Sequence, residues 1–433
     1  MNYKMLYQAK RKTAEEIASL IQSGFTCVAP TCMGQPNAIT AAVTKRAMRG
    51  ELENVKHHSI IAIGEPGFLD PALRGKYDYV SWFTTGTARK SVQEGYSDYM
   101  PCHYSEVAQI WAERGELDVF YAAVTPMDEY GWFSFGLIAS EAAALAAQAK
   151  YVFLEVNPHM PRVPGNNSIH ISQVTAFCEF ESPLPILPEA PITQTDMTIG
   201  HLIAEQIPDG ATIQFGIGGV PNAVGKCLRD KRDLGIHTEL FVDSMVDLIQ
   251  CGAVTNLEKK LHRGKSVATF GWGSENMYRF LQNNPTIELH PVSYVNDPYV
   301  IGQIDNFISV NSCLEVDLLG QVCAESIGPK HYSGSGGQVD FVRGCNRSKG
   351  GKSFIAISST AKGGTVTKIK PTLSPGAAVT TGKNDVDYIV TEFGIARLRG
   401  KTAGERAKAL ISVAHPDFRD QLTFEARKMN LMV

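Results

Sequence analysis

The sequence contains one stretch twice: Gly34-Gln35-Pro36-Asn37-Ala38-Ile39 recurs as Gly219-Val220-Pro221-Asn222-Ala223-Val224, at an offset of 185 residues. A helical pattern before each stretch repeats at an offset of 186, since Ile17, Ala18, Ile21 and Gly24 match Ile203, Ala204, Ile207 and Gly210. Self-similarity at a nearly constant offset is typical of a duplicated structural unit. The chain is therefore predicted to contain two copies of one unit.

Each copy is predicted to form a helix, a short strand, a glycine loop and a second helix that opens at a proline. The strands are Thr26-Cys27-Val28 and Thr212-Ile213-Gln214-Phe215. Proline is tolerated in the first helical turn, because the N–H that it lacks has no helical partner there. A strand, a glycine loop and a helix N-terminus form the phosphate-facing corner of many parallel α/β sheets.

A proline-rich segment separates the two copies. Residues 183–191 contain four prolines, which cannot continue a helix or a central strand. We place the domain boundary there, with an N-terminal domain over 1–185 and a C-terminal domain over 192–433. Short apolar runs alternate with helical stretches, as buried parallel strands do. The predicted fold class is α/β, with two similar open, mostly parallel-sheet domains related by the repeat.

Length and charge exclude several classes of protein. The chain has 433 residues, enough for about two to three domains. Its formal net charge is −3, so it lacks the basic footprint of a nucleic-acid binder and any polybasic patch for membranes. The first residues lack the apolar region that a secretory leader needs, so we expect none, and the sequence has no run of about 18 apolar residues. We expect a cytoplasmic protein without nucleic-acid or membrane partners, and a homo-oligomer, either a dimer or a tetramer.

Several short motifs lack a residue that their chemistry requires. Nine cysteines without a Cys-x-x-Cys pair argue against a disulfide framework or a zinc ribbon, and favour reduced, mostly buried thiols. The run 216–219 resembles the start of a dinucleotide fingerprint, but Pro221 stands where the third glycine is needed. Two Gly-Lys-Ser triplets, at 264–266 and 351–353, lack the preceding glycine of a phosphate loop. His237-Thr238-Glu239 has no Pro-Cys-x-x-Cys to complete a zinc site. No metal site is predicted.

Four longer phrases, taken in order, resemble the acetyl-CoA hydrolase/transferase family, and most closely its 4-hydroxybutyrate CoA-transferase branch. Residues 160–162, 169–170 and 311–318 fit the same pattern, so the resemblance covers nearly the whole chain. The phrases are Gly-Ile-Gly-Gly-Val-Pro-Asn-Ala-Val (216–224), Leu-Gly-Ile-His-Thr-Glu-Leu (234–240), Tyr-Ser-Gly-Ser-Gly-Gly-Gln-Val-Asp-Phe-Val-Arg-Gly (332–344) and Thr-Glu-Phe-Gly-Ile-Ala-Arg-Leu-Arg-Gly (391–400).

The resemblance places the family's catalytic glutamate at Glu239. In that family a glutamate attacks the thioester of an acyl-CoA. By spacing alone, Glu239 is an exposed carboxylate in a short strand over 236–242, after a helix that ends near Gly235. The resemblance instead implies a covalent nucleophile. An ordinary glutamate is already ionised near neutral pH, so no large shift of its pKa is expected.

The resemblance also implies that the C-terminal domain binds CoA and that the N-terminal domain shapes the acceptor side. The loop 214–219 resembles the family's CoA-binding segment, and 334–337 resembles the loop that lines the thioester. Both could equally be ordinary tight turns, and Leu314 and Lys362 could be structural. The implied CoA-binding residues are Gln214, Phe215, Gly216, Ile217, Gly218, Leu314, Gly337 and Lys362.

Four residues are expected to stabilise an oxyanion or to position the carboxylate: Gly336, Gly337, Asn296 and Glu392. Glycine lets backbone N–H groups approach a reacting centre closely, and such donors suit a developing negative charge. Asn296 and Glu392 could instead form hydrogen bonds at strand ends. Ser244 and Cys345 depart from the glycine and alanine expected in relatives, which could alter the acceptor pocket.

The predicted function is transfer of CoA between an acyl-CoA and a short-chain carboxylate, such as 4-hydroxybutyrate, butyrate or acetate, through a glutamyl-CoA thioester. Attack of a carboxylate on a thioester gives an anhydride that the CoA thiolate can reopen. A thioester hydrolase that uses the same glutamate is the alternative, and a non-catalytic CoA-binding protein is a third. The expected partners are an acyl-CoA and a small carboxylic acid. CoA enters as substrate and covalent intermediate, and no permanently bound cofactor is expected.

Overall fold

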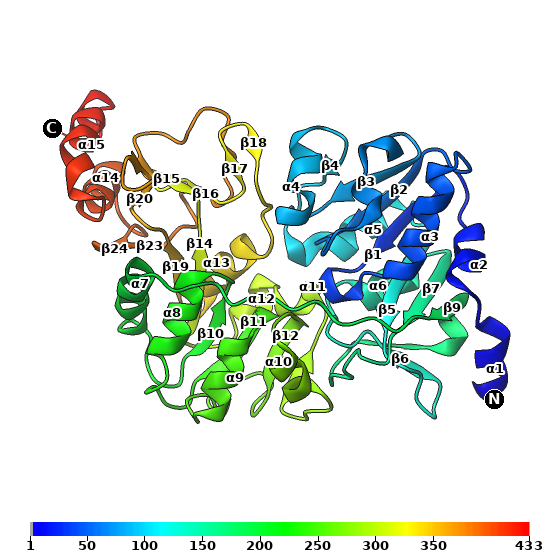
Figure 1. Cartoon of the computed structure of the whole chain (residues 1–433). Helices are drawn as coiled ribbons and strands as arrows, with labels where there is room; N and C mark the ends of the chain where they lie inside the picture. The colour runs from blue at the N-terminus through cyan, green and yellow to red at the C-terminus, as the bar shows by residue number, and fades with distance from the viewer. Residues whose placement is uncertain (1–2, 433) are drawn as a thin grey trace. The chain divides into compact units, whose positions relative to one another are not determined.

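The computed structural model describes residues 3–432, which form two compact units (Figure 1). The first contains the chain up to Leu187 together with Val267–Val295, and the second contains Pro188–Ser266 and the chain from Asn296. The break after Leu187 falls inside the proline-rich segment. The C-terminal domain expected over 192–433 is therefore interrupted in this division.

Backbone hydrogen bonds explain why the segment Val267–Val295 groups with the first unit. The N–H groups of Ala139 and Ser140 both donate to the carbonyl of Thr269, at 2.9 and 3.0 Å. The N–H of Asn166 donates to the carbonyl of Leu289 at 2.8 Å. These partners are more than a hundred positions apart in the sequence, so the local pattern did not predict the interruption.

The first sheet has seven strands in the order β4-β3-β2-β1-β5-β7-β9. All its strand pairs are parallel. Strands β2, β3 and β4 lie in order on one side of β1, and β5, β7 and β9 lie on the other. The order of winding therefore reverses between β1 and β5, which is called the switch point of the sheet. Its strands are β1 (Thr26–Ala29), β2 (Val55–Ser59), β3 (Tyr77–Ser81), β4 (Asp98–Tyr99), β5 (Val119–Val124), β7 (Tyr151–Val156) and β9 (Ala176–Glu179).

The second sheet has eight strands in the order β13-β12-β11-β10-β14-β19-β23-β24. Its order reproduces that of the first sheet, with β10 in the place of β1 and an added antiparallel edge strand, β24. The predicted fold class, two similar mostly parallel sheets related by a repeat, is confirmed. Its strands are β10 (Thr212–Phe215), β11 (Gly235–Phe241), β12 (Ser266–Gly271), β13 (Ile287–Leu289), β14 (Phe307–Ser312), β19 (Lys352–Ala356), β23 (Tyr388–Thr391) and β24 (Gly394–Arg397).

Fifteen α-helices and several short strand pairs complete the described chain. The helices are α1 (Tyr3–Lys10), α2 (Ala14–Ser19), α3 (Asn37–Met48), α4 (Gly86–Gln93), α5 (Val107–Arg114), α6 (Ala142–Gln148), α7 (Gln194–Ala204), α8 (Gly219–Cys227), α9 (Asp243–Gln250), α10 (Glu275–Leu281), α11 (Val292–Val295), α12 (Pro298–Ile301), α13 (Gln338–Arg347), α14 (Ala403–Ser412) and α15 (Pro416–Lys428). The short strands are β6 (Trp132–Ser134), β8 (Ser168–His170), β15 (Glu315–Asp317), β16 (Val322–Cys323), β17 (Ser326–Ile327), β18 (Lys330–His331), β20 (Thr360–Ala361), β21 (Val366–Thr367) and β22 (Ile369–Lys370).

The two repeated helices do not open at their prolines in the same way. Pro36 is the N-cap residue of α3, one position before the helix. In contrast, α8 begins at Gly219, so Pro221 lies inside its first turn. Helix α8 therefore begins two residues earlier than predicted, at Gly219 rather than at Pro221. Proline fits both positions, because neither requires its N–H group.

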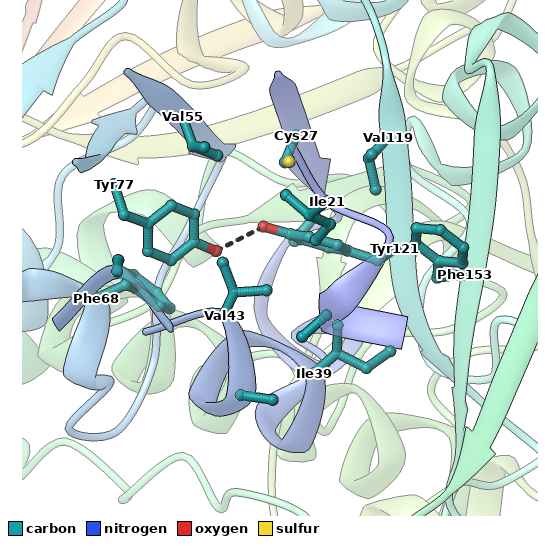
Figure 2. Packing of buried hydrophobic residues seen from close by; sticks show 14 of the residues in the cluster. Ile21, Cys27, Ile39, Val43, Val55, Phe68, Tyr77, Val119, Tyr121 and Phe153 are labelled. Carbon is teal, nitrogen blue, oxygen red and sulfur yellow. Dashed lines mark hydrogen bonds between the residues drawn. The ribbon is translucent and has the colours of Figure 1, made fainter. Parts of the chain in front are cut away.

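The core of the first unit contains a buried polar chain among apolar side chains. Figure 2 shows the hydroxyl groups of Tyr77 and Tyr121 pointing at one another, 2.8 Å apart. The hydroxyl of Tyr121 also lies 2.5 Å from Nδ1 of His57. Burial lowers the pKa of His57 to about 3, so its ring is neutral and the chain carries no buried charge. These hydrogen bonds offset the cost of burying polar groups in the core.

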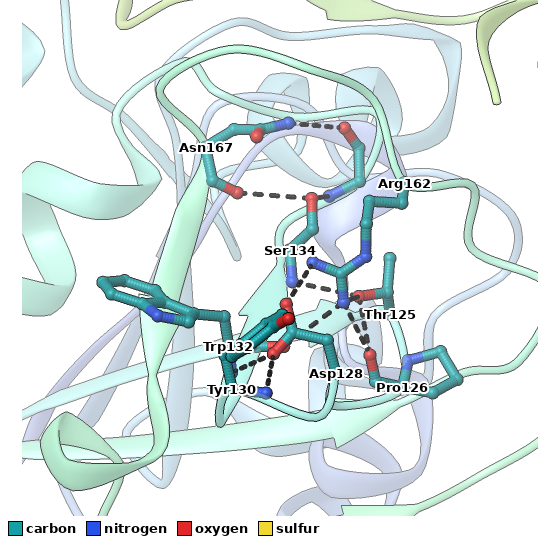
Figure 3. A network of polar contacts seen from close by, with 9 residues as sticks. Thr125, Pro126, Asp128, Tyr130, Trp132, Ser134, Arg162 and Asn167 are labelled. Carbon is teal, nitrogen blue, oxygen red and sulfur yellow. Dashed lines mark hydrogen bonds and ion pairs between the residues drawn. The ribbon is translucent and has the colours of Figure 1, made fainter. Parts of the chain in front are cut away.

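Asp128 organises a tight turn in the first unit (Figure 3). Its Oδ1 accepts hydrogen bonds from the backbone N–H groups of Tyr130 and Trp132, at 3.0 and 2.8 Å. Arg162 supports the same turn, because its guanidinium donates to the carbonyl of Trp132 at 3.2 Å. Gly131 has a φ of +86°, in the left-handed region that favours glycine.

The same turn occurs in the second unit, around Asp317. Its Oδ1 accepts from the N–H groups of Leu319 and Gln321, at 3.0 and 2.8 Å. Gly320 has the same φ of +86° as its counterpart in the first unit. The two turns share only an aspartate and a glycine three positions later, too little for sequence comparison to detect. The duplication therefore extends beyond the repeat that the sequence analysis identified.

The buried carboxylate of Glu155, on β7, caps helix α3. Its Oε2 accepts from the backbone N–H groups of Ala38 and Ile39, at 2.7 and 3.1 Å. The first N–H groups of a helix have no partner within it, so a carboxylate is well placed there. Burial raises the pKa of Glu155 to about 7, although the backbone donors act to lower it.

We expect Glu155 to make the unfolding free energy fall between about pH 5 and pH 7, and Glu155→Gln to lack this contribution to the pH slope. At Glu155 the folded chain keeps a proton in this window that the unfolded chain has lost, so this carboxyl makes stability decrease as pH rises. Urea unfolding at pH 5, 6 and 7 measures the slope. The exposed Glu53, changed to Gln, is the control that should keep the wild-type slope. Equal slopes in the two variants would contradict the prediction.

All nine cysteines are free, and six of them are buried, as the sequence analysis expected. Among residues 3–432, no helix combines the length and apolar character needed to cross a membrane.

Candidate functional site

Glu239 lies near the C-terminal end of β11, in the second unit. It is the partly exposed residue of a strand whose other residues are buried. The side chain of Asn296 lies between α11 and α12, and its Nδ2 donates to Oε2 of Glu239 at 2.7 Å. The backbone N–H of Gly337, the N-cap residue of α13, also hydrogen-bonds the carboxylate. The structure thus brings together three residues that the sequence analysis named for the same reaction centre.

Burial raises the pKa of Glu239 to about 7, and the negative charge of Asp340 acts in the same direction. Hydrogen bonds from Asn296 and Gly337 oppose this rise, because they stabilise the carboxylate. The expectation of an ordinary glutamate pKa is therefore wrong. The pKa is raised because residues from distant parts of the chain shield the carboxylate from water. A carboxylate that titrates near neutral pH is a stronger nucleophile than an ordinary one, because nucleophilicity rises with basicity.

Glycine is required at position 337 by space rather than by backbone conformation. Its φ is −94°, which any residue can adopt. However, a Cβ atom built on Gly337 would overlap Oε2 of Glu239 and Nδ2 of Asn296. The neighbouring Gly336 has a φ of +53°, which lets the loop turn before it reaches the carboxylate.

The glycine loop after β10 leaves its backbone accessible, while the preceding strand residues are buried. Ile217 is 50% exposed, and a Cβ atom on Gly216 would meet no other atom within 4 Å. Gly218 has a φ of +122° and is the N-cap residue of α8. The side chains of Gln214 and Phe215 are only 3% and 1% exposed. A ligand at this loop therefore meets backbone groups and Ile217 first.

Gln214 contacts another strand of the sheet at the switch point. Its side-chain amide pairs with that of Asn311 on β14 in both directions, with two hydrogen bonds of 3.4 Å. The strand order places β10 beside β14, where the direction of winding reverses. Crevices at such points are the usual ligand sites of open α/β sheets. The amide pair adds a side-chain link to the backbone pairing of the two strands at this point.

Three other residues named from the sequence have different surroundings. Glu392 accepts hydrogen bonds from the N–H and hydroxyl groups of Ser359, at 2.9 and 2.6 Å, which occupy both of its carboxylate oxygens. Leu314 is half-buried, and its N–H donates to the carbonyl of Cys323 at 2.8 Å. Lys362 is exposed in the turn between β20 and β21. No hydrogen bond between Glu392 and Glu239 occurs in the part of the chain that the structure describes.

Two buried side-chain polar atoms, one on Asn296 and one on the residue after Gly337, have no hydrogen-bond partner among the described residues. They are Oδ1 of Asn296 and Nε2 of Gln338. Buried polar atoms usually have partners, so these two atoms leave hydrogen-bonding capacity unused in the fold. Gln338 and Asp340 lie in the quoted phrase 332–344, but the sequence analysis did not name them. It assigned a function only to the glycines of that phrase.

Two other glutamates, Glu141 and Glu155, share the raised pKa of about 7 but not the exposure of Glu239. Both are 1% exposed. Glu155 caps α3, and Glu141 accepts from the N–H of Thr31 at 3.2 Å and from the hydroxyl of Ser140. Both carboxylates therefore accept hydrogen bonds from groups within the first unit. Of the three, only Glu239 is partly exposed.

Strand register shows that the first unit has no counterpart of Glu239. Thr26 pairs with Lys56 in the first sheet, and Thr212 pairs with Gly235 in the second. Counting four residues onward from each partner places the buried Ile60 where β11 has Glu239. The two units therefore share a sheet topology, but only the second has a carboxylate at the position of Glu239.

Comparison with known proteins shows the family of the chain. The profile of the acetyl-CoA hydrolase/transferase N-terminal domain matches residues 1–188, and that of the C-terminal domain matches residues 273–426. The chain belongs to the acetyl-CoA hydrolase/transferase family. The resemblance drawn from the four phrases is therefore confirmed.

Members of the acetyl-CoA hydrolase/transferase family resemble the chain over its full length. The succinyl-CoA:cyclohexane-1-carboxylate CoA transferase of Geobacter metallireducens is 47% identical, over 99% of this chain and 98% of that protein. The 4-hydroxybutyrate coenzyme A transferase of Clostridium kluyveri is 42% identical, over 99% of this chain and 100% of that protein. The crystal structure of RipA from Yersinia pestis superposes with a TM-score of 0.95, at 40% identity and with complete coverage of both chains.

Proposed function

We propose that the chain is a CoA-transferase that moves CoA between an acyl-CoA and a short-chain carboxylate through a glutamyl-CoA thioester on Glu239. The observation that carries the proposal is the half-buried carboxylate of Glu239, held by Asn296 and by the N–H of Gly337. The relatives from Geobacter metallireducens and Clostridium kluyveri, which are named as CoA transferases and are more than 40% identical, support the same reaction. We further propose that it acts in the cytoplasm as a homo-oligomer.

The reaction begins when an oxygen of Glu239 attacks the thioester carbonyl and displaces CoA as its thiolate. The thiolate then attacks the glutamyl carbonyl of the resulting anhydride, which releases the first carboxylate and leaves CoA bound to Glu239 as a thioester. An incoming carboxylate repeats these steps in reverse. Each attack places negative charge on a carbonyl oxygen, which the N–H of Gly337 and the amide of Asn296 are placed to stabilise.

The second unit supplies the proposed CoA site. The accessible backbone of Gly216–Gly218 leads into α8, whose N-terminus favours a negatively charged group such as a phosphate. Leu314 and Lys362 are proposed to contact the pantetheine and a phosphate, and Glu392 to help position the reacting carboxylate. The acceptor side is proposed to belong to the first unit. Carboxylates of the size of 4-hydroxybutyrate, butyrate and acetate are the first acceptors to compare.

Hydrolysis is the second candidate function, because the family includes hydrolases and they would use the same carboxylate. The two activities differ in whether water or a carboxylate reaches the glutamyl-CoA thioester. CoA release with and without acetate, followed together with butyryl-CoA consumption, separates them. A transferase consumes butyryl-CoA with acetate at least about tenfold faster than without it.

Trapping the intermediate tests the proposed mechanism directly. The full chain is incubated with butyryl-CoA without an acceptor, and the peptide that contains Glu239 is analysed by mass spectrometry before and after borohydride reduction. A CoA adduct on this peptide, reduced to the alcohol by borohydride and absent from Glu239→Gln, is the expected result. An adduct elsewhere, or turnover without any adduct, would overturn the assignment of Glu239.

The pH dependence of the reaction is expected to report the raised pKa of Glu239. Since the carboxylate attacks, kcat/KM should fall tenfold per pH unit below an apparent pKa of about 7. Initial rates with butyryl-CoA and acetate from pH 5 to pH 8.5 measure the profile. Acetate stays ionised over most of this range, so its own titration contributes little. A profile that stays nearly flat down to about pH 5.5, as the ordinary glutamate value of 4.5 would give, would contradict the prediction.

A further inference from the structure

The loop 332–337, which ends at the N–H that contacts Glu239, is fixed at three points by one residue, Glu325. The carbonyl of Glu325 accepts from the N–H groups of Tyr332 and Ser333, at 2.8 and 3.0 Å. Its carboxylate accepts from the hydroxyl of Ser335, at 3.3 Å. Glu325 therefore binds both the beginning and the middle of the loop, although it lies outside it.

The loop needs an external anchor because three of its six residues are glycines. Glycine loses more conformational freedom on ordering than any other residue and has no side chain to hold it in place. Ser335 is the loop residue directly before Gly336 and Gly337, so its hydroxyl is the last side-chain anchor of the loop before these two glycines. A displacement of about 1 Å at a reaction centre can cost about a hundredfold in rate.

Glu325 is itself held firmly. It is 8% exposed, and the hydroxyl of Thr380 donates to its second carboxylate oxygen at 3.0 Å. The same hydroxyl accepts from the N–H of Ala324 at 2.9 Å, which ties the neighbouring backbone to the same point. The anchor is therefore part of the folded core of the second unit rather than a mobile surface group.

We infer that Glu325 is a positioning residue that acts through Ser335 to hold the N–H of Gly337 at the carboxylate of Glu239. The inference rests on the proposed function, because it assigns a kinetic role to the loop geometry. Glu325 takes no part in bond making or breaking. Its contribution is to keep the hydrogen bond from Gly337 in place while charge moves between Glu239 and the substrate.

The second unit contains a matched control for this anchor. Glu315 is also 8% exposed, and its carboxylate accepts from the hydroxyl and N–H groups of Ser374, at 2.8 and 2.7 Å. Ser374 lies outside the loop 332–337. Ser335→Ala and Ser374→Ala therefore each remove one hydroxyl from a buried glutamate, and only the first removes the side-chain anchor of the loop 332–337.

The test compares these two variants in the full chain by amide hydrogen exchange and by kinetics. Ser335→Ala is expected to speed exchange at Gly336–Gln338 about fivefold or more, the loss expected for one hydrogen bond. Its kcat should fall about 10- to 100-fold. The acidic limb of kcat/KM should move to higher pH, since the Gly337 N–H lowers the pKa of Glu239. Ser374→Ala should leave all three unchanged, and Ser335→Thr, which keeps the hydroxyl, should restore wild-type values.

Two results would overturn the inference. One is unchanged exchange at Gly336–Gln338 in Ser335→Ala, and the other is an equal kinetic effect of the two alanine variants. Glu325→Gln against Glu315→Gln repeats the comparison from the anchor side, should either serine variant fold poorly. A wild-type chain that neither transfers CoA nor forms the Glu239 adduct would end the proposed function instead. The exchange measurement would still decide whether Glu325 holds the loop.

Discussion

Glu239→Gln is expected to lower the rate of CoA transfer by about 10⁴-fold or more, the scale seen when an enzyme loses its covalent nucleophile. The substitution removes the charge at nearly constant shape, and the Gln oxygen can still accept from Asn296. CoA binding should therefore persist, because the proposed CoA contacts lie on other residues. Initial rates with butyryl-CoA and acetate, together with CoA titration calorimetry, measure the two properties separately.

Two further variants sharpen this result. Glu239→Asp keeps the charge but shortens the side chain by one methylene, so transfer should fall about a hundredfold rather than disappear. Glu155→Gln is the control, since it neutralises another glutamate whose pKa is raised to about 7, and it should retain transfer. Each sample is checked by mass spectrometry for deamidation back to glutamate. Transfer near the wild-type rate in undeamidated Glu239→Gln would place the nucleophile elsewhere.

The architecture of this chain was predictable from its sequence because the duplication left a visible repeat. The matched stretches at Gly34 and Gly219 indicated two copies, and the two sheets indeed share one strand order. The likeness between the turns at Asp128 and Asp317 was not predicted, because an aspartate followed three positions later by a glycine often occurs by chance. The segment Val267–Val295 escaped as well, since its hydrogen-bond partners are far away in the sequence.

The identity of the site residues was easier to predict than their electrostatics. Glu239, Asn296 and Gly337 were named from a family resemblance, and they lie in contact. The resemblance said nothing about desolvation, because the pKa of Glu239 depends on what tertiary packing places around it. Asp340 raises this pKa from a helix a hundred residues later in the chain. A residue pattern records which groups are present, whereas their burial follows only from the fold.

Gly337→Ala is expected to lower kcat at least about a hundredfold while the chain remains folded. The backbone of Gly337 has a φ of −94°, so alanine adds no conformational strain. The added Cβ would overlap the carboxylate of Glu239 and the amide of Asn296, and both must shift to make room. A shift of about 1 Å at the reacting atoms is enough for a hundredfold loss. Initial rates and thermal unfolding of the variant measure the two effects.

Gly382→Ala is the matched control for this substitution. Gly382 also lies in the second unit, and a Cβ atom there would meet no atom within 4 Å. It should transfer CoA at the wild-type rate. If Gly337→Ala lost activity only in proportion to its loss of folded protein, the defect would be one of stability. If it kept wild-type kcat, the close approach of Gly337 to Glu239 would not be needed for transfer, because the site could then accept a methyl group between its nucleophile and its hydrogen-bond donor.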